Sequence, residues 1–311
     1  MDPKTAQAFA PAGLSSFFEI CDKDEKGSPL SDLTLVGARG GGFGLAKGVW
    51  TTVTVEKAKT SGITVIINGK RAPEAETTRT VVNTILTEVN QSYVVIVNHK
   101  IEVPIGSGFG TSAGGALTAG LALKEALNLP LTFNQIGRIA HVAEVQCQTG
   151  LGTVGPLMVS GCALTLEPGA PGISVIDRLP LRPNCCIVSG VIGPIPTKQV
   201  LSSKEKRVEV NRYGKKTLEA ILDEPSVENF LACCLEFAEK TGFMTSRLRE
   251  LVGLAEKAGA VGVAQNMVGE AVHALVLEEN AEAVAEAFKE VLPSQQVVIS
   301  KIDFQGARLI K

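Results

Sequence analysis

The sequence predicts an α+β protein of two domains, and three observations support this prediction. The chain has 311 residues, which is long enough for two domains that share an interface. In its second half, strand-like and helix-like segments alternate with short turns, as in a two-layer α+β domain. A run rich in proline and glycine at 168–172 is the candidate boundary, so we expect an N-terminal domain over residues 1–170 and a C-terminal domain over residues 171–311.

Local patterns predict the elements in order along the chain. Apolar and β-branched runs indicate strands at Ala8–Ile20, Val49–Val55, Ile63–Asn68, Tyr93–Asn98, Cys186–Gly193, Ala271–Leu277 and Gln296–Ser300. Helical periodicity indicates helices at Thr78–Glu88, Ala116–Leu127, Thr132–Gln148, Ser203–Leu222, Pro225–Thr241, Met244–Ala258 and Glu282–Val291. Asn68-Gly69 between two strand-like runs predicts a type I′ hairpin. The glycine-rich segments 36–45 and 259–269 are expected to be loops or turns, and the segment 149–172 a glycine-rich return into a strand.

The composition excludes several classes of function. A formal net charge of -2 and a pI of about 6.0 leave no basic surplus for nucleic acid or an anionic membrane. The seven cysteines have no regular spacing, which argues against a disulfide framework or a zinc ribbon. No apolar run is long enough to span a membrane, and the first residues lack an apolar signal region. We therefore expect a cytoplasmic protein that acts on a small molecule, with neither nucleic acid nor membrane as a partner.

The most informative stretch is a dense glycine segment between the strand at Tyr93–Asn98 and the apolar helix at Ala116–Leu127. Glycines at this density allow positive φ angles and a close approach of the backbone to a ligand. Thr111 and Ser112 are natural N-cap residues for the helix that follows. Because the first amides of a helix are unpaired and carry the positive end of its dipole, we expect this loop to bind an anion, and phosphate in particular.

Two better-known phosphate loops do not fit this segment. The Walker pattern ends in Gly-Lys-Ser/Thr, and the loop contains no lysine. The dinucleotide fingerprint needs a third glycine where this chain has Thr111, and an acidic residue about twenty residues later, after a second strand. The residues that follow are instead predicted to be helical. The alternative to a phosphate loop is a glycine-rich turn into a core helix.

Three polar residues outside the loop are candidates for the site. Arg39 stands among glycines, where a guanidinium could bind a carboxylate or phosphate, or could be a solvated arginine of a hairpin loop. Glu144 borders the apolar stripe of the predicted helix Thr132–Gln148, either as a solvated edge or as a group of the site. His141 lies one turn earlier on the same side, as a substrate contact or a structural histidine.

The loop residues Pro104-x-x-x-Gly108-Phe-Gly-Thr-Ser-Ala113 resemble the central motif of the GHMP kinase superfamily (galacto-, homoserine, mevalonate and phosphomevalonate kinases). The order of segments is also similar: an Ala-Pro strand near the N-terminus, the glycine loop, a Glu-bearing helix, and a late glycine segment at 259–269. The resemblance covers essentially the whole chain. Within the superfamily, the segments 37–43, 140–144, 149–152, 168–172 and 193–201 resemble those of the archaeal pantoate kinases.

This resemblance implies a two-domain GHMP kinase fold. It comprises an N-terminal mixed sheet with helices and a C-terminal two-layer α/β sandwich, with the site in the cleft between them. It also implies ATP and Mg²⁺ as cofactors, transfer of phosphate to the primary hydroxyl of pantoate for coenzyme A biosynthesis, and a homodimer.

The resemblance assigns roles to individual residues. Those expected to bind ATP are Pro104, Gly106, Ser107, Gly108, Gly110, Thr111, Ser112, Ala113 and Gly114. Ser112 and Glu144 are expected to hold the metal and, with Thr153, to form the catalytic group. Those expected to bind the acceptor are Ala38, Arg39, His141 and Thr165.

Three residues depart from the family pattern. Thr153 stands where many members have an acid, so a carboxylate base is absent at that position. Ala38 stands where a serine is expected, and Thr165 where an arginine is expected. Two alternatives therefore stay open: a related kinase or transferase with another hydroxy-acid or sugar acceptor, and a nucleotide-binding protein of weak catalytic activity.

Overall fold

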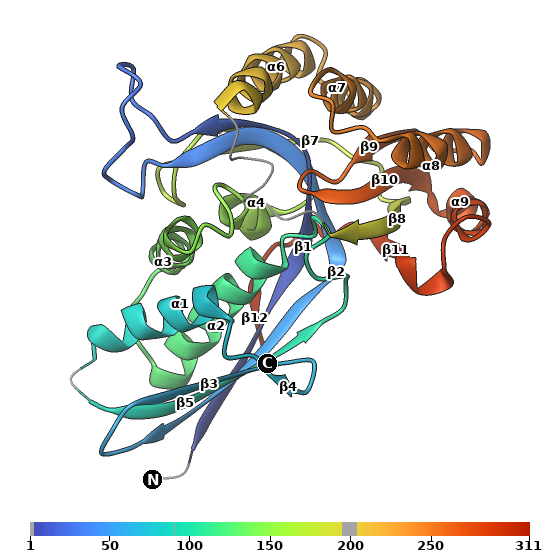
Figure 1. Cartoon of the computed structure of the whole chain (residues 1–311). Coiled ribbons are helices and arrows are strands. Elements are labelled where there is room, and N and C mark those ends of the chain that lie inside the picture. The colour runs from blue at the N-terminus through green and yellow to red at the C-terminus, as the bar shows by residue number, and fades with distance from the viewer. Residues whose placement is uncertain (1–2, 90, 195–203) are drawn as a thin grey trace.

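Two β-sheets form the framework of the protein in the computed structural model, which describes residues 3–89, 91–194 and 204–311 (Figure 1). The larger sheet has eight strands in the order β12-β1-β2-β5-β3-β4, with β6 paired to β2 and β7 paired to β6. The smaller sheet has four strands in the order β11-β8-β10-β9. With helices packed on both sheets, the predicted α+β architecture is confirmed.

The larger sheet is built on two long antiparallel strands, β1 (Lys4–Cys21) and β2 (Gly37–Lys57). One half of β2 pairs with β5 (Tyr93–Ile101), and its glycine-rich half pairs with β6 (Cys162–Glu167). The expectation of a loop at 36–45 was therefore wrong. The glycines there serve close strand packing, because a Cβ on Gly42 would lie 1.6 Å from the carbonyl oxygen of Leu14.

The remaining strands extend the larger sheet. They are β3 (Gly62–Ile67), which runs parallel to β5, β4 (Lys70–Arg71), β7 (Val175–Leu179) and β12 (Arg308–Ile310). Asn68 and Gly69 join β3 to β4 with φ angles of 48° and 81°, which confirms the predicted type I′ hairpin. The segments β7 and β12 belong to this sheet although both follow residue 170, so the division at that residue stays a prediction.

Helices α1 (Glu76–Thr87), α2 (Thr111–Leu127) and α3 (Phe133–Gln146) cover one face of the larger sheet (Figure 1). Strand β5 supports them by alternation, since Val95, Val97 and His99 are buried while the residues between them are exposed. Thr132 caps α3 through a capping box with Gln135. The short helix α4 (Val154–Val159) was missed because its sequence reads as a glycine-rich turn.

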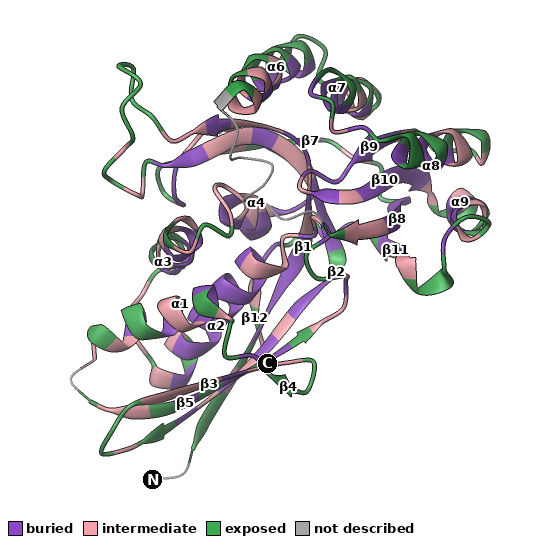
Figure 2. Cartoon of the chain, viewed as in Figure 1, coloured by how far each residue is buried: buried purple, intermediate pink, exposed green. Residues whose placement is uncertain are grey.

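Helix α2 is buried on nearly every side (Figure 2). It packs against β1, β2 and α3, and small residues permit this close packing. A Cβ on Gly114 would lie 3.0 Å from Cγ2 of Val49, and one on Gly120 would lie 2.8 Å from Cγ2 of Ile136. Because α2 is enclosed, its N-terminus has a fixed position above β1 and β2, where the candidate site is found.

The smaller sheet consists of β8 (Cys185–Pro194), β9 (Gly262–Gln265), β10 (Gly269–Leu277) and β11 (Val297–Lys301). The helical layer and its short 3-10 turns comprise α6 (Lys204–Asp223), α7 (Val227–Lys240), α8 (Ser246–Lys257), η1 (Glu278–Asn280), α9 (Ala281–Lys289) and η2 (Ser294–Gln296). Strand β9 corrects the prediction of a turn over all of 259–269. Part of the predicted motif at 193–201 and the start of the predicted helix at Ser203 lie outside the described residues.

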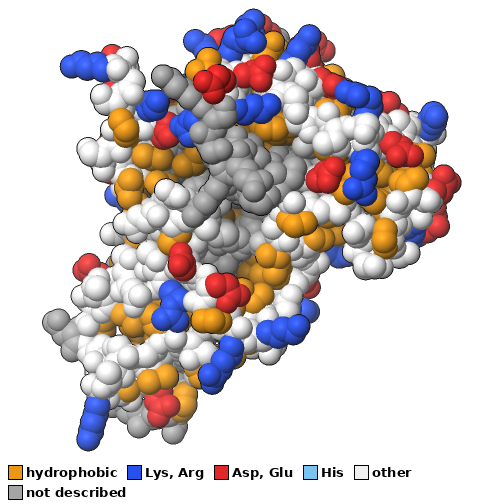
Figure 3. Space-filling model, viewed as in Figure 1, with side chains coloured by type: hydrophobic (Ala, Val, Ile, Leu, Met, Phe, Trp, Pro, Cys, Tyr) orange, Lys and Arg blue, Asp and Glu red, His pale blue; other side chains and the backbone are white. Residues whose placement is uncertain are grey.

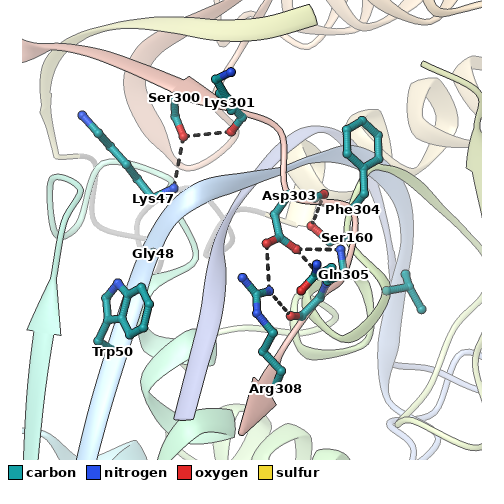
Figure 4. Close-up of polar contacts among 12 residues, drawn as sticks. Lys47, Gly48, Trp50, Ser160, Ser300, Lys301, Asp303, Phe304, Gln305 and Arg308 are labelled. Atoms are coloured by element: carbon teal, nitrogen blue, oxygen red, sulfur yellow. Dashed lines mark hydrogen bonds and ion pairs between the residues drawn. The ribbon is translucent and has the colours of Figure 1, made fainter. Parts of the chain in front are cut away.

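The C-terminal segment connects the two sheets (Figure 4). After β11, Ile302 forms a β-bridge with Leu45, and the amide of Asp303 donates to the carbonyl of Gly44 at 2.9 Å. The buried carboxylate of Asp303 accepts a hydrogen bond from Arg308 at 2.8 Å before β12 pairs with β1. Within the described ranges, no helix has the length and apolar character that a membrane span requires.

Candidate active site

A cavity of about 950 Å³ is lined by residues of both sheets. The larger sheet contributes parts of β1, β2 and β6, and the helical layer contributes the start of α2, Glu144 of α3 and the α3–α4 connection. The smaller sheet contributes Pro194, Met267 and Val268. On the face in Figure 3, acidic and basic side chains are intermixed, in keeping with the small net charge.

The segment 104–110, here called the glycine loop, needs glycine at three alternate positions. Gly106, Gly108 and Gly110 have φ angles of 78°, 79° and 61°. Residues other than glycine rarely adopt this left-handed backbone conformation. Phe109 between them is buried and anchors the loop in the core, and its carbonyl accepts a hydrogen bond from the amide of Gly13 at 3.0 Å. The loop is therefore a fixed structure that leads directly into α2.

Helix α2 begins at Thr111, and its N-cap is Gly110, without a side-chain capping bond. The prediction that Thr111 or Ser112 caps the helix was therefore wrong. Both lie in the first turn, and both line the cavity. A first turn without a capping side chain leaves amide donors available to an anion, and the helix dipole favours negative charge at this end.

The smaller sheet supports the glycine loop through the turn between β9 and β10, residues 266–269, here called the supporting turn. The side-chain amide of Asn266 donates to the carbonyl of Ser107 at 3.4 Å. A Cβ on Gly269 would lie 2.4 Å from the same carbonyl oxygen, so only glycine fits there. Val268 has a φ of 63°, a strained conformation for a β-branched residue, and it lines the cavity.

Ser112 and Glu144 lie together at the start of α2. The hydroxyl of Ser112 donates to Glu144 Oε1 at 2.5 Å, and the hydroxyl of Thr149 donates to the same oxygen at 2.6 Å. Thr77 of α1 completes the cluster, with its hydroxyl 3.0 Å from that of Thr149. The structure thus brings together the two residues that sequence reasoning selected as metal ligands, and adds Thr77 and Thr149, which it missed.

Burial raises the pKa of the Glu144 carboxyl, and the hydrogen bonds from Ser112 and Thr149 oppose that effect. Only 3% of the residue is exposed. A buried carboxylate with bonded hydroxyls suits a hard cation, because Mg²⁺ is usually held by one or two carboxylates together with substrate phosphates and waters. The described residues contain no cluster of three or more histidine, cysteine, aspartate or glutamate side chains that could hold a metal ion.

Thr153 lies beside the end of the glycine loop. It is the N-cap of α4 and lines the cavity. Its methyl group packs near Gly110, where a Cβ would lie 2.9 Å from Thr153 Cγ2. Gly150, in the same connection, faces the carboxylate of Glu144, because a Cβ there would lie 2.3 Å from Oε2. The α3–α4 connection therefore holds a hydroxyl next to the loop, and glycine makes room for Glu144.

Arg39 lines the cavity, but its guanidinium already has three partners. Its Nε donates to the carbonyl of Leu166 at 3.0 Å, and its terminal nitrogens lie 3.3 Å from carboxylate oxygens of Glu19 and Glu167. These contacts explain why the expected loop arginine is instead a fixed part of β2.

His141 does not reach the cavity. It is 1% exposed, and its Nε2 lies 2.8 Å from the carbonyl of Val36, at the start of the glycine-rich half of β2. Burial lowers its pKa, although hydrogen bonds to backbone groups oppose that effect. This geometry suits a neutral histidine that positions Val36, which does line the cavity.

The other predicted residues divide into two groups. Ala38 and Thr165 line the cavity. Ala38 packs against Gly152, because a Cβ on Gly152 would lie 3.3 Å from the Cβ of Ala38. Ala113 also lines it, whereas Pro104, Ser107 and Gly114 do not. Ser107 is buried and Gly114 packs against Val49. These last residues support the loop from behind.

Sequence reasoning missed a buried polar network behind the glycine loop. His273 of β10 lies between Asn266 Oδ1 at 2.7 Å and the Ser16 hydroxyl at 2.9 Å, and all three residues are fully buried. Because Asn266 Oδ1 can only accept, Nδ1 of His273 carries the proton and Nε2 accepts from Ser16. Sequence reasoning also missed Arg207, an α6 residue on the cavity wall. Neither His273 nor Arg207 stands in a motif.

Comparison with known proteins identifies the family of this chain. Residues 78–161 match the family described as the GHMP kinases N terminal domain. This stretch of the chain contains the glycine loop, α2 and Glu144. A pantoate kinase of Thermococcus kodakarensis is 32% identical over 92% of this chain and 92% of its own length. A pantoate kinase of Methanocaldococcus jannaschii is 28% identical over 88% of this chain and 94% of its own length.

The structure is similar to a solved structure described as a phosphotransferase related to the coenzyme A biosynthesis pathway. The TM-score is 0.87 at 29% sequence identity, and the match covers 98% of each chain. The fold and the site thus define a small-molecule kinase. The chain belongs to the GHMP kinase family, and its relatives over nearly the full length include the archaeal pantoate kinases.

Proposed function

We propose that this kinase transfers the terminal phosphoryl group of ATP to the primary hydroxyl of pantoate, giving 4-phosphopantoate for coenzyme A biosynthesis. The observation that carries the proposal is the similarity to pantoate kinases over about nine tenths of the chain, at 32% and 28% identity. The solved phosphotransferase related to the coenzyme A pathway supports the same assignment.

The glycine loop and the first turn of α2 bind the β- and γ-phosphates in this proposal. Phosphoryl transfer needs little covalent help from the protein and depends on positioning and charge stabilisation. Three positive-φ glycines expose backbone amides, and the α2 dipole points its positive end at the same place. Ser112 and Glu144 hold Mg²⁺, which when bound neutralises charge that develops on the phosphate oxygens.

The acceptor lies along the cavity wall formed by Ala38, Arg39 and Thr165. His141 acts indirectly by holding the carbonyl of Val36. Thr153 has no carboxylate with which to remove the acceptor proton, but a loose transition state needs little deprotonation of the nucleophile. Thr153 therefore orients the acceptor hydroxyl beside the loop. The expected homodimer and cytoplasmic location stay predictions.

The test is ADP release with ATP and Mg²⁺, with and without D-pantoate, for the wild-type protein and Ser112→Ala. We expect release that depends on pantoate and falls at least about 100-fold in the variant, because the hydroxyl beside Glu144 is lost. Mass spectrometry of the product checks that the primary hydroxyl carries the phosphate.

Two outcomes would contradict the proposal. Turnover of a different hydroxy acid or a sugar, but not pantoate, would assign another acceptor to the same site. Nucleotide binding without turnover of any acceptor would indicate a binding protein of weak catalytic activity. Nucleotide binding is therefore measured separately, by titration calorimetry with a non-hydrolysable ATP analogue, in both proteins.

A further inference from the structure

Positive charge is scarce on the cavity wall. Among the described residues that line it, Arg39 and Arg207 are the basic ones, and no lysine or histidine joins them. A carboxylate that leaves water for a largely apolar cavity needs a charged partner or several donors. Among the described residues, these two guanidinium groups and backbone amides are therefore the candidates to bind the carboxylate of an anionic acceptor.

Arg39 is poorly placed to accept another carboxylate. Glu19 and Glu167 each lie 3.3 Å from its terminal nitrogens, so the three side chains together carry a formal charge of about -1. Its Nε is also bonded, to the carbonyl of Leu166 at 3.0 Å. A third carboxylate would meet net negative charge and few free donors. Arg39 thus serves to hold β2, β1 and β6 together at the cavity edge.

Arg207 has a different environment. It projects from α6, and its guanidinium forms an ion pair with Asp22, at 2.5 Å, which follows the end of β1. The described part of the chain gives this guanidinium one carboxylate partner, so the pair is formally neutral. A guanidinium has five N–H donors, and one aspartate leaves several of them available. The side chains of Arg207 and Asp22 are 25% and 30% exposed, so the pair is partly desolvated yet accessible.

The surroundings of Arg207 suit the body of a short organic acid. Phe18 and Leu30 also line the cavity and are apolar, and the amide of Leu30 donates to the carbonyl of Asp22 at 3.0 Å. A second cavity of about 630 Å³ shares Asp22, Leu30, Arg39 and Arg207 with the main one, so Arg207 lies where the two meet. A charged donor group beside an apolar wall is what a small hydroxy acid with an alkyl body requires.

We propose that Arg207 binds the carboxylate of the acceptor, and that Asp22 holds the guanidinium in place and competes with that carboxylate. The inference rests on the proposed function in one respect, since it takes the acceptor to be a hydroxy acid. Arg207 is then a specificity-determining residue that selects acids over neutral alcohols. Thr165 of β6 is uncharged and cannot bind a carboxylate as a cation would. Arg207 of α6 supplies that positive charge to the cavity wall instead.

The test compares an acid with its neutral amide. Initial rates are measured with D-pantoate and with D-pantoamide, at saturating ATP, for wild type, Arg207→Gln, Arg207→Lys and Asp22→Asn. Arg212→Gln is the matched control, because Arg212 lies on the same helix and is exposed.

We expect Arg207→Gln to raise the KM for pantoate by about 10- to 100-fold, the size of a lost charge-assisted contact, with unchanged KM for pantoamide and for ATP. Arg207→Lys should recover part of the loss, and Asp22→Asn should lower the KM for pantoate.

Each other outcome overturns the inference or the proposed function. Equal effects of Arg207→Gln on acid and amide, or no effect on either, would show that Arg207 does not bind the carboxylate. An increase confined to the KM for ATP would assign Arg207 to the nucleotide phosphates instead. If wild type phosphorylates another hydroxy acid but not pantoate, the proposed function fails, and the same comparison with that acid and its amide decides the role of Arg207. Turnover of neutral sugars alone would overturn both.

Discussion

Nδ1 of His273 donates to Oδ1 of Asn266 at 2.7 Å, and this contact joins the smaller sheet to the glycine loop. Asn266 contacts the loop directly, because its side-chain amide nitrogen donates to the carbonyl of Ser107. On the other side, Nε2 of His273 accepts from Ser16 of β1. The conformation of the glycine loop is therefore determined partly by a histidine on a strand of the other sheet.

This network leads to the first prediction, for Asn266→Leu. The substitution keeps the forked shape of the side chain and leaves two buried groups, Nδ1–H of His273 and the Ser107 carbonyl, without partners. Each such group costs about 1–3 kcal/mol of stability. We expect a lower free energy of unfolding in urea and an increase of about 10-fold in the KM for ATP, with the KM for the acceptor unchanged. Ser16→Ala removes only the far contact and should have the smaller effect.

An equal rise in both KM values for Asn266→Leu would contradict a role confined to the glycine loop. Unchanged kinetics with reduced stability would show that the network is purely structural.

The second prediction concerns pH. Burial lowers the pKa of His99 to about 4 and that of His273 to about 3. Between the ordinary value of 6.5 and these values, the unfolded chain takes up protons that the folded chain does not. Stability should therefore fall as the pH falls below 6.5, by up to about 1.4 kcal/mol per pH unit for each histidine. Glu144 acts in the opposite direction, because burial raises its pKa.

Urea unfolding at several pH values between 7 and about 4.5 measures this slope. His273→Gln is the comparison, since it removes one of the histidines whose pKa burial lowers and should flatten the curve in this range. The same slope in the variant and the wild type would show that His273 is not buried in its neutral form.

Much of this site could be predicted from local sequence, and the misses have identifiable physical causes. The glycine loop was found because alternate glycines before a helix have few other uses. The N-cap was misassigned because Ser112 bonds Glu144, a partner 32 residues away that no local rule detects. The strand at Gly37–Lys57 was missed in its first half because its glycines allow the close approach of β1. Arg207 and Asp22 are 185 residues apart, so only the fold brings them together.

The third prediction uses the space that Gly150 leaves for Glu144. A Cβ at residue 150 would lie 2.3 Å from Oε2 of that buried carboxylate, so Gly150→Ala forces one of them to move. We expect kcat to fall at least about 10-fold, and the Mg²⁺ concentration for half-maximal rate to rise, because small displacements in a preorganised site are costly. Gly253→Ala is the matched control, since that glycine lies in α8 with nothing within 4 Å of its Cβ position. Gly253→Ala should retain wild-type kinetics, and a normal Mg²⁺ dependence in Gly150→Ala would contradict the prediction.

The last prediction concerns Asp303 and the C-terminal segment that joins the two sheets (Figure 4). Its carboxylate accepts from the amides of Gln305 and Gly306 at 3.0 and 2.7 Å and from Arg308 at 2.8 Å. Asp303→Ala removes all three bonds, whereas Asp303→Asn retains an oxygen acceptor for the two amides and loses the charge and the acceptor for Arg308. We expect about 2–4 kcal/mol of destabilisation for alanine, and about 1 kcal/mol for asparagine because Arg308 is partly exposed and solvent screens the ion pair.

Hydrogen–deuterium exchange can locate this effect within the fold. The amides of 306–310 should exchange faster in Asp303→Ala, because β12 pairs with β1 over only three residues, Gln7 to Phe9, and depends on the preceding turn. The amides of β5, which pairs with β2 on the far side of the sheet, should keep their wild-type rates, since none of their partners changes. Faster exchange in both strands would show that Asp303 stabilises the whole sheet rather than its C-terminal strand. Wild-type exchange in 306–310 would show that strand pairing alone holds the segment.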